Sequence, residues 1–154
     1  MTDSFNHASV VAIEGAGIAL IGPSGSGKSD LALRLIDRGA TLVGDDYVLF
    51  NAVGERLRCF PNPALTGRIE IRGIGIASIP YVSDVPLRLC VELGIEGERM
   101  PMSDLRHSIA GYTVPMMSIM PYQASAPIRI EYKIKSIVDA DVWPIADQPY
   151  GKQE

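Results

Sequence analysis

The chain has 154 residues, of which 47% are hydrophobic and 21% are charged, and this composition is typical of one soluble globular domain. Its formal net charge of −4 gives no overall attraction to nucleic acid or to an anionic membrane. No apolar run is long enough to span a bilayer, and residues 1–8 lack the pattern of a signal peptide. We therefore expect a single soluble, cytoplasmic domain, residues 1–154, that binds neither nucleic acid nor membranes.

The first part of the chain predicts a β-hairpin and then a helix. Residues 9–13 and 18–21 are short apolar segments on either side of a glycine-containing turn, as in a hairpin. The apolar side chains of residues 30–38 have helical spacing, and Gly39 is a natural helix stop.

Strands and loops are expected in most of the remaining chain. We expect strands at residues 41–43, 47–50, 56–60 and 85–93, a turn at 51–55, and loops with short strands over 94–126. Residues 128–138 are ambiguous, because their isoleucines fit both strand alternation and one face of a helix. Residues 147–154 are polar and are expected to fray. Cys59 and Cys90 fit no metal-ligand spacing, so we expect both in the core.

Residues 22–29, here called the glycine loop, satisfy the phosphate-binding (P-loop) pattern G-x-x-x-x-G-K-[ST] between a strand and a helix. Glycines let main-chain N–H groups point at phosphate oxygens, and the helix start adds unpaired amides. The lysine is expected to reach the terminal phosphates, and the last serine hydroxyl to ligate Mg²⁺. A chance glycine–serine turn is the alternative. The loop predicts nucleotide binding by Gly22, Pro23, Ser24, Gly25, Ser26, Gly27, Lys28 and Ser29.

Asp45 and Asp46 follow the strand after that helix. In a parallel crossover this strand lies beside the one that feeds the glycine loop, so we expect both carboxylates in the same crevice. One carboxylate could hold Mg²⁺ and the other could take a proton from an attacking hydroxyl, since neighbours on a strand point to opposite faces. A solvated turn is the alternative interpretation, because Gly-Asp-Asp is also good turn chemistry.

Glu70 and Arg72 belong to the unusual string Glu-Ile-Arg-Gly-Ile-Gly-Ile at residues 70–76. Two residues apart, they would share one face of an extended segment. Glu70 is a candidate metal ligand, and Arg72 is a candidate clamp for phosphate oxygens. A surface ion pair at a sheet edge explains the pattern equally well.

Together these three features resemble the catalytic domain of the HPr kinase/phosphorylase family, over about residues 7–76. The string at residues 70–76 is the most specific feature, since other phosphate-loop proteins do not carry it. The resemblance implies an α/β fold, a P-loop-containing mixed β-sheet with flanking helices, like HPr kinase and PEP carboxykinase. It also implies an ATP- and Mg²⁺-dependent protein-serine kinase that acts on the phosphocarrier protein HPr, and a hexamer.

The resemblance also implies roles for individual residues. Lys28 corresponds to the catalytic, phosphate-binding lysine, and Ser29 and Glu70 correspond to Mg²⁺ ligands. The proton acceptor falls on Asp46, also a candidate metal ligand, with Asp45 as its close helper.

Three further catalytic candidates are His7, Arg72 and Arg99. His7 falls where the family has a histidine near the active site, and Arg99 is a weaker candidate for a catalytic arginine.

Two departures from the family pattern stand out. Long members carry an extra N-terminal domain, whereas this chain starts at the catalytic one, which suggests a short form. The family's proline- and arginine-rich loop should lie near residues 114–121, where this chain has methionines and no arginine. Since a site for inorganic phosphate needs positive charge, we expect the phosphorylase reaction to be weak or absent.

Two other functions share the glycine loop. A small kinase acting on a metabolite would need the same loop, but it offers no explanation for residues 70–76. A nucleotide-binding regulatory module without catalysis would bind ATP and leave its γ-phosphate intact.

Overall fold

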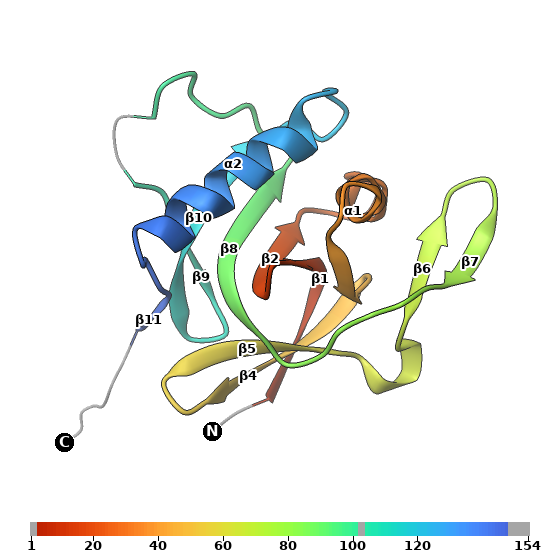
Figure 1. Ribbon diagram of the computed structural model, residues 1–154, viewed down its shortest axis with the longest axis horizontal. Helices are drawn as coiled ribbons and strands as arrows, with labels where there is room; N and C mark the ends of the chain where they lie inside the picture. The colour runs from red at the N-terminus through yellow and green to blue at the C-terminus, as the bar shows by residue number, and fades with distance from the viewer. Residues whose placement is uncertain (1–2, 102–103, 148–154) are drawn as a thin grey trace.

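The computed structural model describes residues 3–101 and 104–147, which form a curved, mixed β-sheet with two α-helices (Figure 1). The predicted mixed sheet with flanking helices is thus confirmed. In chain order the elements are β1 (Asp3–Ile13), β2 (Ala16–Ile21), α1 (Lys28–Asp37), β3 (Thr41–Gly44), β4 (Tyr47–Val53), β5 (Arg56–Pro61), a 3₁₀ turn (Pro63–Leu65), β6 (Arg68–Ile71), β7 (Gly75–Ser78), β8 (Val85–Leu93), β9 (Arg106–Ile109), β10 (Tyr112–Ile119), α2 (Ala126–Asp139) and β11 (Ile145–Ala146).

The main sheet places several strand ends at one edge. In the described residues its order is β11-β10-β8-β2-β1-β4-β5, with β3 paired to β1 and β9 paired to β10. Strands β2, β8 and β10 run parallel, while β1 is antiparallel to both β2 and β3. Strand β3 therefore runs in the same direction as β2, and the carboxyl ends of β3, β2, β8 and β10 open at the same edge. This is the edge where α/β proteins bind ligands.

The neighbour predicted for the aspartate-bearing strand is wrong. We expected β3 to lie beside β2, but β1 lies between them. The cause is the length of β1, whose 11 residues are long enough to pair with β2, β3 and β4. The aspartates still reach the shared edge, because β3 and β2 point the same way.

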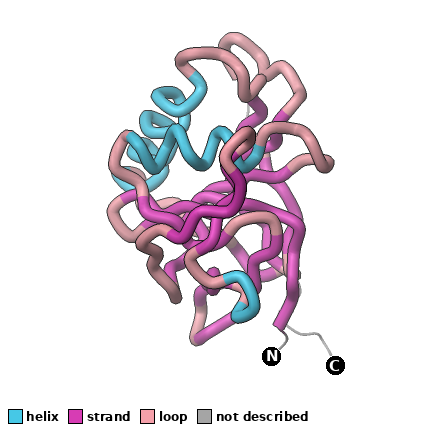
Figure 2. The backbone as a smooth tube through the Cα atoms, turned by 90° about the vertical axis from the view of Figure 1, so that its right-hand side faces the viewer, coloured by secondary structure: helices cyan, strands magenta, loops and turns pink. Residues whose placement is uncertain are grey.

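Alternation along the strands divides the core into two layers. On β1, Val10 and Ala12 face one cluster of buried side chains, and Val11 faces the other. The second cluster contains buried residues of both α-helices, and Figure 2 shows these helices gathered at one face of the sheet. Figure 1 shows α2 crossing β8 and β10, α1 next to it, and the β6–β7 hairpin beyond α1. The hairpin forms a separate two-stranded sheet.

The ambiguous segment 128–138 is helical, within α2. Ile130, Ile134 and Ile137 are buried on one face of this helix, so packing against the sheet selects the helical alternative. In the tail, Asp147 accepts hydrogen bonds from Ser108 and Thr113, and the other tail residues lie outside the described ones.

Both cysteines are free and buried, as expected. Burial raises the pKa of the Cys90 thiol to about 12, and it raises the pKa of Cys59 well above its usual value.

Strand β10 was not expected at this length, because residues 94–126 were expected to hold loops and short strands. Most of 114–121, the place of the family's proline- and arginine-rich loop, therefore belongs to a strand of eight residues. The prediction of a loop is therefore wrong for residues 114–119, which belong to β10, and Ile119 is buried in the core.

The described residues include no helix that is long and apolar enough to cross a membrane.

Candidate active site

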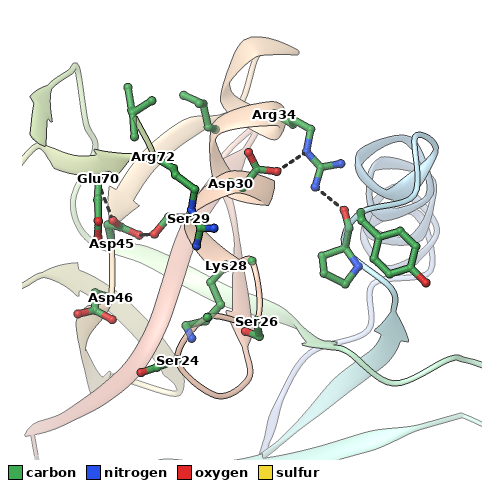
Figure 3. Close-up of a pocket in the computed structure, with 16 residues that line it drawn as sticks. Ser24, Ser26, Lys28, Ser29, Asp30, Arg34, Asp45, Asp46, Glu70 and Arg72 are labelled. Atoms are coloured by element: carbon green, nitrogen blue, oxygen red, sulfur yellow. Dashed lines mark hydrogen bonds and ion pairs between the residues drawn. The ribbon is translucent and has the colours of Figure 1, made fainter. Parts of the chain in front are cut away.

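A cleft of about 610 Å³ opens where the glycine loop, the start of α1, the end of β3 and the β6–β7 hairpin meet. This volume lies within the roughly 300–1,000 Å³ of typical small-ligand sites. The structure thus brings most of the predicted site residues together, and Figure 3 shows the cleft. Its hydroxyl and charged side chains are Ser24, Ser26, Lys28, Ser29, Asp30, Arg34, Asp45, Asp46, Glu70 and Arg72.

The glycine loop has a backbone that only glycine adopts easily. Gly22, Gly25 and Gly27 have φ values of 153°, 80° and 99°. At Gly22 a side chain would also clash, since a Cβ would lie 2.8 Å from the Ser26 hydroxyl oxygen. Gly27 caps α1 without a side-chain hydrogen bond, so no cap side chain satisfies the N–H groups of the first turn. Ser26 Oγ is itself buried and has no partner among the described residues.

These groups fit a phosphate. An unpaired hydroxyl and unpaired helix N–H groups are donors, and the positive end of the helix dipole favours negative charge at the same place.

The Lys28 side chain binds to the main chain of the glycine loop. Its Nζ donates to the carbonyl oxygens of Gly22 at 2.8 Å and Pro23 at 3.0 Å. Burial lowers the pKa of Lys28, and the nearby carboxylates of Asp46 and Asp45 partly offset this effect. An ammonium that is poorly hydrated and held beside a donor-rich loop is prepared to bind a phosphate oxygen.

Asp45 joins three parts of the cleft. Its Oδ1 accepts hydrogen bonds from Ser9 Oγ and Ser29 Oγ, both at 2.7 Å, and its Oδ2 accepts from the main-chain N–H of Glu70 at 3.1 Å. The side chain is only 7% exposed, so these bonds compensate for the burial of a carboxylate. Asp45 therefore fixes β1, the start of α1 and β6 around one point (Figure 3).

Asp46 turns the other way, to the rim of the cleft. The Tyr47 N–H donates to the Asp45 carbonyl at 2.8 Å, which makes Asp46 the centre of a γ-turn with a φ of 73°. The Asp46 side chain is 58% exposed, and its Oδ1 lies 2.6 Å from His7 Nε2. His7 also contacts the Tyr47 ring, with 5.4 Å between the ring centroids.

The two aspartates thus have separate environments, as expected, but the cause is the γ-turn beyond β3 and not the pleat of a strand. Sparsely populated backbone conformations of this kind cluster at functional sites.

Glu70 and Arg72 both line the cleft, but not in the way expected. Glu70 lies on β6, which ends at Ile71, so Arg72 belongs to the following turn and not to an extended strand. The extended segment on which a shared face depended therefore ends before Arg72. Figure 3 shows Arg72 extending toward Ser29 and Lys28. No salt bridge joins Glu70 to Arg72 within the described residues, so the alternative of a simple surface ion pair has no support.

Arg99 is not brought to the cleft. It is exposed in the loop after β8 and does not line this cavity, so its catalytic role stays a prediction. Sequence reasoning missed Ser9, a buried hydroxyl in the apolar run of β1, although a polar residue there was a usable signal. It also missed Arg34 and Tyr122, which line the cleft from α1 and from the turn after β10.

The donor set suits Mg²⁺. Because Ser29 donates its proton to Asp45, the lone pairs of its hydroxyl oxygen are free for a cation. Glu70 adds an exposed carboxylate, and Asp45 rather than Asp46 is the aspartate next to Ser29. In residues 3–101 and 104–147 no three His, Cys, Asp or Glu side chains gather as a metal cage. Mg²⁺ usually needs no such cage, since it is held by one or two carboxylates, waters and substrate phosphates.

The fold agrees with what the chain resembles among known proteins. Residues 2–151 match the family described as HPr Serine kinase C-terminal domain, so the chain belongs to that family. The HPr kinase/phosphorylase of Neisseria meningitidis is 32% identical over 97% of this chain and 49% of the relative. The HPr kinase/phosphorylase of Chlorobium phaeobacteroides is 32% identical over 73% of this chain and 37% of the relative.

A solved structure shows the same fold. The Hpr(Ser) kinase/phosphatase from Coxiella burnetii matches with a TM-score of 0.75 and 27% identity, over 90% of this chain and 98% of that chain. The chain spans less than half the length of these curated relatives.

Proposed function

We propose that this chain is a catalytic unit that transfers a phosphoryl group from ATP to a serine of an HPr-type phosphocarrier, in an Mg²⁺-dependent reaction. The observation that carries the proposal is the hydrogen-bonded junction of Ser29, Asp45 and the main chain of Glu70, beside the buried ammonium of Lys28. A phosphate loop, a metal-binding hydroxyl and an acidic group in one cleft are what phosphoryl transfer requires. Family membership supports the phosphocarrier as acceptor.

Binding is the task of the glycine loop. Its main-chain N–H groups, Ser26 Oγ and Lys28 Nζ would hold phosphate oxygens, and Arg72 reaches the same space from the hairpin turn. Since transfer of this kind needs little covalent help, most of the rate comes from positioning and charge neutralisation. Ser29 and Glu70 would hold Mg²⁺, which would supply part of that neutralisation.

Proton transfer is the task of Asp46. Its exposed carboxylate at the rim is reachable by a serine on another protein, whereas Asp45 is buried and already accepts three hydrogen bonds. Asp46 would accept the proton of the attacking hydroxyl, and His7, 2.6 Å away, would hold the carboxylate in position.

The reverse, phosphorylase reaction is proposed to be weak or absent. The segment 114–121 carries no arginine, and the Arg34 guanidinium near it is occupied by Asp30 and by the carbonyls of Pro121 and Gln123. Rapid release of phosphate from phospho-HPr at millimolar phosphate, as fast as the kinase step, would contradict this. A cytoplasmic location, a single domain, a hexamer and a PEP carboxykinase-like arrangement stay predictions.

The experiment combines the protein with γ-labelled ATP, Mg²⁺ and an HPr-type phosphocarrier. We expect the label on a serine of the phosphocarrier and none on a variant with that serine replaced by alanine. Label in a small-molecule acceptor would instead indicate a metabolite kinase. Tight ATP binding with an intact γ-phosphate and no labelled acceptor would indicate a regulatory module.

A further inference from the structure

The order of the strand ends determines which groups lie at each end of the cleft. Along the shared edge the carboxyl ends follow the order β3, β2, β8, β10, with Asp45 and Asp46 after β3 and the glycine loop after β2. Figure 3 shows Asp45, Asp46 and Glu70 on one side of Lys28, and Arg34 on the other side. A triphosphate that extends across the loop with its terminal end at the acidic groups would carry its nucleoside away from them, toward Arg34 and the end of β10.

The turn after β10 borders that end of the cleft. Pro121 and Tyr122 both line the cavity. Pro121 is packed so close to the glycine loop that a Cβ on Gly27 would lie 3.3 Å from its Cγ. Tyr122 lies beside it and is 76% exposed. Tyr122 is therefore accessible to a ligand that is bound in the glycine loop.

The backbone under this ring is held on both sides. The Arg34 guanidinium donates to the carbonyl of Pro121 and, at 3.4 Å, to the carbonyl of Gln123. The Gln123 carbonyl also accepts from the Ala126 N–H at 3.0 Å at the start of α2. Since Arg34 belongs to α1, these bonds tie the turn to the helix that begins at the glycine loop. The ring is thus free to contact a ligand while its main chain is fixed, which lowers the entropy cost of binding.

We propose that Tyr122 stacks on the nucleobase of the bound nucleotide, with Pro121 as the apolar floor of this subsite. The proposal rests on nucleotide binding by the glycine loop, the first step of the proposed function. An aromatic ring presents its face to the base and does not read the hydrogen-bonding edge, so every base can stack there. The subsite therefore adds affinity for nucleotides over inorganic polyphosphate without selecting adenine over guanine.

The test compares the dissociation constants of Mg²⁺-ATP, Mg²⁺-GTP and Mg²⁺-tripolyphosphate by calorimetry, for the full chain and three variants. Tyr122→Ala should weaken both nucleotides about 10-fold, equivalent to about 1.4 kcal/mol, and should leave tripolyphosphate unchanged. Tyr122→Phe, which keeps the ring, should bind all three like the parent protein. Tyr132→Ala is the matched control, because Tyr132 is 73% exposed on α2 but does not line the cleft.

Each other outcome has a distinct meaning. If Tyr122→Ala binds ATP and GTP like the parent, or loses tripolyphosphate affinity to the same extent, the base subsite is overturned while the phosphate site stands. If the parent protein binds none of the three probes, the proposed function is overturned, and the subsite with it.

Discussion

Asp45 and Asp46 are neighbours in the chain, yet they belong to two different regions of the cleft. The inner region, around Asp45, is buried, and its carboxylate accepts hydrogen bonds from Ser9, Ser29 and the Glu70 main chain. The outer region, around Asp46, is exposed and contains a γ-turn and a contact with His7. A buried carboxylate that is already satisfied holds the site together, whereas an exposed one can exchange a proton with a partner. The γ-turn at Asp46 thus separates two environments.

The largest effect is expected in the outer region. Asp46→Asn should lower phosphoryl transfer about 10²- to 10⁴-fold, because an amide cannot accept the hydroxyl proton. The melting temperature should not change, since asparagine tolerates the positive φ of this position. The measurement is the transfer rate at saturating ATP together with thermal unfolding.

Asp84→Asn is the matched control for that variant. Asp84 also has a positive φ, of 63°, and its side chain is 57% exposed, but it lies away from the cleft and pairs with Arg58. Its replacement should leave transfer at the parent rate. A near-normal rate in Asp46→Asn would exclude Asp46 as the base.

A substitution in the inner region should mainly lower the stability of the fold. Asp45→Ala leaves the hydroxyls of Ser9 and Ser29 and the N–H of Glu70 without their acceptor. We expect the free energy of unfolding to fall by about 3 kcal/mol, measured by urea denaturation. A loss below about 0.5 kcal/mol would show that the junction does not hold the site together.

Lys28 borders both regions, and its replacement should change the affinity for ATP much more than the stability of the fold. Lys28→Met should weaken ATP binding about 10- to 100-fold, because a charge-assisted bond to phosphate is lost. Stability at neutral pH should fall little, because the loss of the hydrogen bonds from Nζ to the Gly22 and Pro23 carbonyls is offset by removal of the burial cost that lowers the pKa of Lys28.

The pH dependence follows from the sign of that shift. The cost is present in full below the lowered pKa and disappears as pH rises toward 10.5, the usual pKa of lysine. The stability of the parent protein should therefore rise relative to that of Lys28→Met over this range. Lys135→Met, on the exposed surface of α2, is the control and should change neither binding nor this pH profile. A marked loss of stability in Lys28→Met at pH 7 would contradict the account.

The smallest effect is expected for Ser9→Ala, which removes one of the three donors to Asp45. The free energy of unfolding should fall by about 1.5 kcal/mol, since a buried hydrogen bond to a charged group is lost. Ser108→Ala removes a comparable serine–aspartate bond, to Asp147, at an exposed position, and it should cost less than about 0.5 kcal/mol. Equal losses in the two variants would show that the buried Ser9–Asp45 bond contributes no more to stability than the exposed Ser108–Asp147 bond.

The glycine loop could be predicted from the sequence because local geometry demands each of its residues. Gly22 and Gly27 have backbone angles that other residues rarely adopt, and a lysine must follow if the loop is to reach phosphates. Residues 41–43 and 85–93 could be predicted as strands because of their apolar composition and, in the second segment, the alternation of aliphatic with other side chains, and the structure has strands there.

Other features depend on contacts between distant parts of the chain, which a local pattern does not contain. The position of β1 between β2 and β3 depends on which strands its edges meet, and the choice of helix for α2 depends on packing over β8 and β10. Ser9 is 36 residues from Asp45, and Arg34 is 87 from Pro121, so neither partnership has a sequence signature. The γ-turn at Asp46 likewise follows from pairing on both sides of it.

The affinity for ATP with and without Mg²⁺, measured for Asp45→Asn and Asp46→Asn side by side, tests the division of tasks most directly. Asparagine keeps the shape of the side chain in both variants. We predict that Asp46→Asn binds ATP more tightly with Mg²⁺, as the parent does, because Ser29 remains oriented by Asp45. Asp45→Asn should lose most of this Mg²⁺ dependence. If the two variants behave alike, or if Asp46→Asn alone loses the Mg²⁺ dependence, the assignment of the two aspartates is contradicted.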